Sequence, residues 1–336
     1  MVSRPGIGHH QAMARVRAGI CGAVGAVLAV ACATPRPAAL VKVGAEDLGA
    51  PVPGLDVCDR HSPGVLQLDP ARPLTLFVHG CKDSGGRFRD LAQVFEAHGQ
   101  QTACFNYDHR DSLDRSAGEL VTVLEALKAR LPPGRITVVA HSQGGLVARR
   151  ALIRERPDAV REGDGFTYRL TTISAPFAGI RASADCGKTW LHVLTLGVTV
   201  AVCQLVAGSN WSEIPPGSAF TTHPGTLLPE VREVLEVTTD ERDACLERAG
   251  DGSCRRRDFV FGLDEQRNPA VESDPRLWRS EVSAGHVEIV GGAGVTPRKL
   301  VAVLQEQGVL ARTPPGRREE IAALLRRLFG AVADAR

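Results

Sequence analysis

Short apolar runs alternate with amphipathic segments over much of the chain. The runs are bounded by glycine, proline or polar residues, which predicts strands at 74–78, 102–107, 136–140 and 170–174. Between them, leucines recur at helical spacing from Leu120 to Leu131, and a second apolar helical face runs from Phe88 to Phe95. Strands that alternate with helices need crossover connections. The pattern therefore predicts an α/β fold with a mostly parallel, doubly wound sheet.

A serine lies at the sharpest predicted turn, between the strand at 136–140 and a helical run that begins at Leu146. The sequence Ala140-His141-Ser142-Gln143-Gly144-Gly145 is a G-x-S-x-G nucleophile elbow with alanine in place of the first glycine. Small residues permit the strained backbone that such a turn requires. The N–H of Gln143, at the start of the outgoing helix, is placed to stabilise an oxyanion. We predict that Ser142 is a nucleophile; the alternative is a serine that only caps the helix.

A serine nucleophile needs a histidine as base, and that histidine needs a carboxylate to orient it. His286 is the predicted base because it lies in a flexible turn late in the chain, before a helical run from Pro297. A histidine of a surface loop is the alternative for His286. His79 lies in the turn after the strand at 74–78, and His141 lies in the turn that holds Ser142, which favours structural roles for both.

The sequence leaves two candidates for the carboxylate. We predict a strand over Asp258–Gly262, and Asp264 and Glu265 follow in its exit loop. Asp264 is favoured because aspartate is the commoner acid of such triads. Glu265 is favoured by its spacing from Gly262 and from the proline at 269. Both assignments stay open at this point.

Together these motifs resemble bacterial lipases and esterases of the α/β-hydrolase fold. The resemblance extends over about residues 72–310 and rests on Leu76–Gly80, Ala140–Gly145, Ile173–Pro176, Gly217-Ser218 and Gly285–Glu288. It implies that the N–H of Cys81 is a second oxyanion donor beside that of Gln143. The order Ser142, acid, His286 along the chain agrees with that family.

The predicted function is a serine carboxylester hydrolase that cleaves acyl-lipid-type esters through an acyl-enzyme on Ser142, with no metal or organic cofactor. The same triad could instead transfer the acyl group to an acceptor other than water. A third alternative is a catalytically silent, surface-anchored lipid-binding protein. The complete serine, histidine and acid set argues against this last function, because a binding cleft does not need all three.

The strand–helix rhythm stops between Ala178 and Ser218. The stretch Thr189–Ser212 contains no aspartate, glutamate, lysine or arginine. We predict an apolar lid within an insertion at about 180–218, and a buried core helix is the alternative. The hydrolase domain is then expected at 40–312, followed by a basic amphipathic helix at 313–336.

Residues 1–33 are predicted to be an export signal, because a basic start precedes the small and apolar run from Ile20 to Ala31. Cys32 is the residue that would be acylated in a lipoprotein. Cleavage after Ala31 or Ala33 without acylation is the alternative. The protein is accordingly expected in the periplasm or as an outer-membrane lipoprotein with membrane contact through its lipid, or else secreted.

Cysteine content and charge refine this picture. The nine cysteines include no C-x-x-C pair, which argues against a zinc ribbon or a thioredoxin-like site. Cys21 and Cys32 belong to the expected export signal. Among the other seven, in an oxidising compartment, we expect Cys245–Cys254, Cys186–Cys203 and Cys58–Cys104 disulfides, with Cys81 left over. A net charge of +2 and 4% aromatic residues give no support for nucleic-acid binding. No oligomeric state is predicted.

Overall fold

A computed structural model of the chain describes residues 52–58, 66–187, 208–291 and 294–330. The expected export signal, Cys32 and most of the predicted lid lie outside these residues. None of the helices in the described ranges combines the length and the apolar character needed to cross a membrane.

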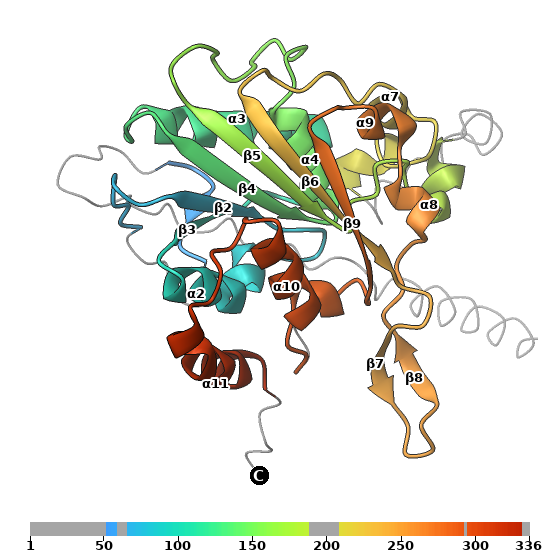
Figure 1. Cartoon of the computed structure of the whole chain (residues 1–336). Helices are drawn as coiled ribbons and strands as arrows, with labels where there is room; N and C mark the ends of the chain where they lie inside the picture. Colours follow the sequence, from blue (N-terminus) through green and yellow to red (C-terminus); the bar gives the residue numbers. More distant parts are fainter. Residues whose placement is uncertain (1–51, 59–65, 188–207, 292–293, 331–336) are drawn as a thin grey trace, which may run out of the picture. The chain divides into compact units, whose positions relative to one another are not determined.

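A seven-stranded sheet organises the described residues, in the order β1-β3-β2-β4-β5-β6-β9 (Figure 1). The strands are β1 (Leu55–Asp56), β2 (Leu74–Val78), β3 (Gln101–Phe105), β4 (Arg135–His141), β5 (Thr167–Ile173), β6 (Val231–Asp240) and β9 (Leu277–Ser283). Neighbouring strands are parallel except β1 and β3. The predicted α/β-hydrolase class with a mostly parallel, doubly wound sheet is confirmed.

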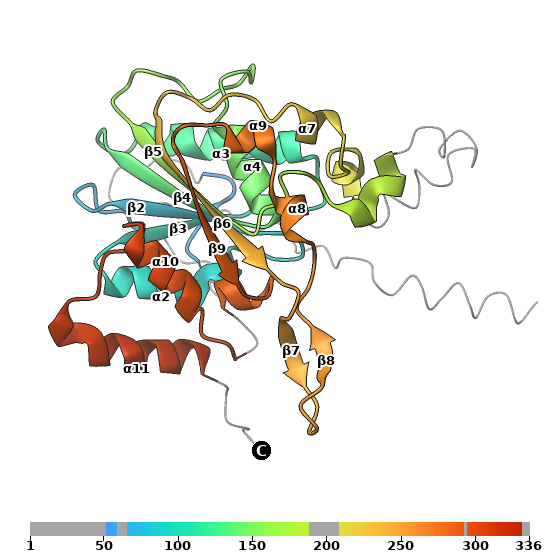
Figure 2. The same ribbon diagram turned by 45° about the vertical axis from the view of Figure 1, so that its right-hand side comes forward.

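Helices cover both faces of this sheet (Figures 1 and 2). One face carries α3 (Leu113–Lys128) and α4 (Gln143–Ala151), and the other carries α2 (Arg89–Ala97), α10 (Arg298–Glu306) and α11 (Arg318–Phe329). Strand side chains alternate between the two apolar cores: Val138 packs with α3 and α4, whereas Val139 packs with α2 and α10. This alternation explains why the central strands carry apolar side chains on both faces.

Shorter elements connect the strands and the long helices. They are η2 (Gly85–Phe88), η3 (Arg181–Gly187), η4 (Gly208–Ser212), α7 (Ala219–Thr222), α8 (Leu263–Gln266), α9 (Pro269–Glu272), η5 (Glu288–Val290) and η6 (Pro315–Arg317). A hairpin of β7 (Cys245–Arg248) and β8 (Cys254–Arg257) follows β6. The strand predicted at Asp258–Gly262 is wrong, because this segment is irregular. Three of its backbone N–H groups bond to Glu241 or Ala244, in the loop that follows β6.

Two of the expected disulfides are present, Cys58–Cys104 and Cys245–Cys254. Cys203, the expected partner of Cys186, lies outside the described residues. Cys81 is exposed and takes part in neither of these two disulfides. Disulfides of this kind are typical of exported proteins, because the cytosol keeps thiols reduced.

Candidate active site

The turn between β4 and α4 holds Ser142 at the carboxyl edge of the sheet. Ser142 has a φ of 55° and a ψ of −126°, a strained backbone for a residue with a side chain. Its N–H donates to the carbonyl of Ile173 at 2.8 Å. A Cβ at Gly144 would lie 2.3 Å from the carbonyl oxygen of His79, so only glycine fits there. The geometry is that of the predicted nucleophile elbow.

Ser142, His286 and Glu241 form one hydrogen-bonded chain. His286 Nε2 lies 3.0 Å from Ser142 Oγ, and His286 Nδ1 lies 2.9 Å from Glu241 Oε1. A carboxylate can only accept, so Nδ1 carries the proton of a neutral imidazole and Nε2 accepts from the serine hydroxyl. All three residues are buried. The arrangement has the geometry of a serine nucleophile, its base and the acid that orients the base.

Neither carboxylate proposed from the sequence reaches His286. Asp264 is solvent-exposed and pairs with Arg181, whose guanidinium lowers the pKa of the Asp264 carboxyl through a hydrogen bond. Glu265 is buried, but its oxygens accept the N–H groups of Arg181 at 2.7 Å and of Gly262 at 2.8 Å. Glu265 thus ties the loop after β5 to helix α8. The structure contradicts the prediction that Asp264 or Glu265 orients His286, because the carboxylate that reaches Nδ1 is that of Glu241.

Glu241 follows directly after β6, and both oxygens of its carboxylate accept hydrogen bonds. Oε1 accepts from the hydroxyl of Thr239 at 3.0 Å as well as from His286. Oε2 accepts the N–H groups of Val260 at 2.7 Å and of Phe261 at 3.3 Å. The sequence predicts an acid just after a strand, and Glu241 holds such a position, after β6 and not after 258–262. The predicted strands do not include 231–240, so the sequence alone does not single out Glu241.

A second buried carboxylate, that of Asp258, holds the loop of His286. It accepts the N–H groups of Val287 at 3.0 Å and of Glu288 at 2.8 Å, while the carbonyl of Asp258 accepts the N–H of His286. A Cβ at Gly285 would lie 2.1 Å from Asp258 Oδ2, so this approach depends on glycine. Strand β8 ends at Arg257, and the segment that follows it, residues 258–261, contacts both Glu241 and the loop of His286.

His141 supports the base from the other side. Its Nε2–H donates to the carbonyl of His286 at 3.0 Å, and the two rings lie 4.7 Å apart between centroids. Burial lowers the pKa of His141 well below its ordinary value, and the charge of a protonated His286 lowers it further. His141 is therefore a neutral donor that fixes the backbone of the base. This agrees with the structural role predicted for it.

The turn after β2 lies against the nucleophile. A Cβ at Gly80 would lie 3.0 Å from the Cβ of Ser142. His79 shapes this turn: its Nδ1–H donates to the carbonyl of Gly80 at 2.9 Å, and its ring stacks on Tyr107 at 4.4 Å. The N–H of Cys81 follows, one residue beyond Gly80. Its role as an oxyanion donor, and that of the N–H of Gln143, remain predictions.

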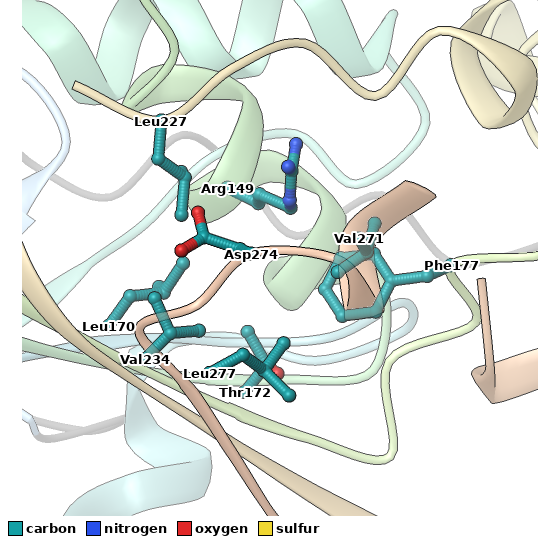
Figure 3. A pocket seen from close by; sticks show the side chains of 9 residues that line it. All are labelled: Arg149, Leu170, Thr172, Phe177, Leu227, Val234, Val271, Asp274 and Leu277. Atoms are coloured by element: carbon teal, nitrogen blue, oxygen red, sulfur yellow. The ribbon is translucent and has the colours of Figure 1, made fainter. Parts of the chain in front are cut away.

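A small cavity lies elsewhere, between the sheet and the helices α4 and α9 (Figure 3). Its volume is about 10 Å³, roughly the room for one water molecule. Arg149, which lines it, donates to the carbonyls of Pro224 and Gly225, and burial lowers the pKa of its guanidinium to about 10. None of the triad residues lines this cavity, so it is not the substrate site. Among the described residues, no group of three or more histidine, cysteine, aspartate or glutamate side chains could hold a metal ion.

Comparisons with known proteins agree with a hydrolase. Residues 89–205 match the model of a family described as "Putative serine esterase (DUF676)". This segment includes the elbow and Ser142 but neither Glu241 nor His286. A comparison with curated protein sequences finds no match.

Several solved structures resemble the chain. The mature lipase BlEst2 of Bacillus licheniformis is 15% identical, with a TM-score of 0.47 over 71% of this chain and 93% of that one. The esterase Pf2001 of Pyrococcus furiosus is 14% identical, with a TM-score of 0.38 over 78% and 84%. A carboxylesterase structure from Nitrososphaera gargenis is 12% identical, with a TM-score of 0.40 over 72% and 91%.

A mostly parallel seven-stranded sheet carries the elbow at Ser142 at its carboxyl edge, with His286 and Glu241 in hydrogen-bond reach. The chain is therefore a protein of the α/β-hydrolase fold whose residues 89–205 match a serine esterase family.

Proposed function

We propose that the protein is a carboxylic ester hydrolase that works through an acyl-enzyme on Ser142. The observation that carries this proposal is the chain of two hydrogen bonds from Ser142 through His286 to Glu241. The strained elbow supports the same function, because a helix-capping serine needs no positive φ. The acid of the triad is Glu241 in this proposal.

In the first half of the reaction, Ser142 Oγ attacks the carbonyl carbon of the ester and His286 Nε2 takes the hydroxyl proton. Glu241 stabilises the resulting imidazolium through Nδ1–H. The tetrahedral intermediate collapses, and His286 returns the proton to the departing alcohol. In the second half, His286 takes a proton from water, which attacks the acyl-enzyme. The proton then returns to Ser142 as the acid is released.

The N–H groups of Gln143 and Cys81 would bind the oxyanion. Gln143 is the first residue of α4, where N–H groups have no acceptor within the helix. Its side chain donates to the carbonyl of His109 at 2.8 Å, which keeps the amide group away from the nucleophile. Donors held in place before the reaction lower the barrier without reorganising during it.

An acyl-lipid-type ester is the proposed substrate class. The uncharged stretch Thr189–Ser212 supports it, since its described end lies beside the catalytic turn. Asn210 Nδ2 donates at 2.9 Å to the same carbonyl of His109 that accepts from Gln143. Gly208 packs so closely on the backbone of Arg110 that a Cβ would lie 2.1 Å from its carbonyl oxygen. The predicted lid would thus be tied down within reach of Ser142.

The test compares Ser142→Ala with the matched control Ser273→Ala, which removes an exposed hydroxyl at the end of α9. Labelling by a fluorophosphonate and turnover of p-nitrophenyl esters should vanish in Ser142→Ala, to about a thousandth of the wild-type rate or less. Ser273→Ala should keep both. Normal labelling of a folded Ser142→Ala protein would contradict the proposal. Product analysis with an added alcohol separates hydrolysis, which yields free acid, from acyl transfer.

A further inference from the structure

The β7–β8 hairpin is strongly basic and extends away from the sheet (Figures 1 and 2). Its two strands contain four arginines and one glutamate. Arg255, Arg256 and Arg257 are consecutive, and all of β8 is exposed. The disulfide Cys245–Cys254 joins the two strands and holds them together. The contacts with Glu241 and with the loop of His286 come from residues 258–261, beyond the two strands, so the proposed catalysis does not use the arginines of the hairpin.

The acidic groups of the hairpin do not neutralise these arginines. Glu247 Oε1 lies 3.9 Å from Arg255, and its Oε2 lies 3.7 Å from Arg256, so one carboxylate serves two guanidinium groups. In the described part of the chain, no carboxylate forms an ion pair with Arg257. Asp251 at the tip is occupied by the N–H and the hydroxyl of Ser253. The hairpin therefore presents an excess of positive charge.

Two apolar side chains lie at the root of the hairpin. Phe259 and Val260 are 48% and 49% exposed, which is unusual for large apolar residues. The N–H of Val260 donates to Glu241, and the ring of the next residue, Phe261, lies 4.8 Å from that of His286. The exposed apolar pair is thus adjacent in the chain to residues that contact the triad.

We propose that this surface, formed by Arg255–Arg257 with Phe259 and Val260, docks the protein on a phospholipid surface that carries anionic headgroups. Guanidinium groups bind phosphate oxygens in a bidentate manner, and an aromatic ring beside them can enter the interface between headgroups and acyl chains. Docking there would place the catalytic edge of the sheet at the lipid surface. The inference goes beyond the proposed hydrolysis, since binding requires no reaction.

Binding to phospholipid vesicles tests the inference without catalysis. Full-length protein that carries Cys32→Ser and Ser142→Ala is mixed with neutral vesicles or with vesicles of about 30% anionic lipid, and the bound fraction is measured by flotation. We expect binding to anionic vesicles that weakens as salt is added. The triple change Arg255→Gln, Arg256→Gln, Arg257→Gln should lower the partition coefficient by up to about a hundredfold. Phe259→Ser with Val260→Ser should lower it about tenfold.

A matched triple change on α11, Arg318→Gln, Arg326→Gln and Arg327→Gln, removes the same charge and should change the partition coefficient less than about twofold. All variants share the same leader and the Cys32→Ser change, so their differences report on the hairpin. Equal losses in both triple variants would overturn the proposal, as would absence of binding to anionic vesicles. A dimer in light scattering that the hairpin change abolishes, without vesicle binding, would assign the surface to a second copy. Failure of ester hydrolysis in the wild-type protein would leave this result unaffected.

Discussion

Replacing Glu241 with glutamine changes the state of the base without removing the side chain that holds it. The N–H groups of Val260 and Phe261 point at Oε2, and a backbone N–H can only donate. The amide oxygen of the glutamine must therefore occupy that position. Its NH₂ group then faces Thr239 and His286 in place of the carboxylate oxygen.

This orientation reverses the tautomer of His286. An NH₂ group donates to Nδ1, so the proton of the neutral imidazole moves to Nε2, which faces Ser142 Oγ at 3.0 Å. Nε2 can then no longer accept the serine proton. The loss of a triad acid lowers kcat by about ten thousandfold in the well-studied case, which corresponds to about 5.5 kcal/mol in the barrier. The backbone bonds to the side chain are largely kept, so the free energy of unfolding should fall by only about 1 kcal/mol.

The assay is kcat/KM on a short-chain p-nitrophenyl ester, with the melting temperature as a check on folding. Asp264→Asn is the control for a carboxylate paired with Arg181 at the surface, and it should change the rate less than about threefold. Glu265→Gln should lower stability more than rate, because its carboxylate holds two backbone N–H groups. A folded Glu241→Gln enzyme with more than about a tenth of the wild-type rate would refute the assignment. So would a loss in Asp264→Asn as large as that in Glu241→Gln.

Two further predictions concern pH and the loop of the base. Burial raises the pKa of Glu236 to about 7 from 4.5, so the unfolded chain releases this proton first and folding stability falls as the pH rises between these values. The wild-type protein should therefore lose about 3 kcal/mol of its free energy of unfolding between about pH 5 and pH 8, and Glu236→Gln should remove this loss. The free energy of unfolding is measured in urea at each pH. Equal dependence of this free energy on pH in both proteins would contradict the prediction. Gly285→Ala should displace the carboxylate of Asp258, lower the free energy of unfolding by about 1–3 kcal/mol and lower kcat. An unchanged denaturation curve would show that the close approach of Gly285 to Asp258 is dispensable.

The central strands could be predicted because each is buried on both faces and is therefore a continuous apolar run. β2 is buried at all five positions, and its neighbour β4 is buried except at Arg135 and Thr137. β6 could not be found in this way, since Val231–Asp240 contains four charged residues. One of them, Glu236, is buried opposite Arg279 of β9, a pairing across strands that only the fold reveals. β9 is an edge strand with mostly exposed side chains, so it has no apolar run either.

In the candidate site, too, some residues are marked by local sequence and others are revealed only by the fold. Ser142 and His286 could be predicted because local sequence marks them, one by the small residues of a turn and the other by its glycine-containing loop. The acid carries no such local mark: any carboxylate at a strand end qualifies, and the choice depends on where the strands end. Because β6 has no apolar run, the sequence points instead to Asp264 and Glu265, and their partner Arg181 lies more than 80 residues away in the chain.

The disulfide Cys58–Cys104 has a consequence for production of the protein. It fastens the two-residue strand β1 to β3 at one edge of the sheet. Such a short strand has few hydrogen bonds of its own with which to stay in place. When the cysteines are reduced, β1 can detach, and the free N–H and C=O groups of β3 become a template for strands of other chains. The disulfide thus keeps the edge of β3 covered and disfavours aggregation. Recombinant chain made in a reducing cytosol should therefore collect in inclusion bodies.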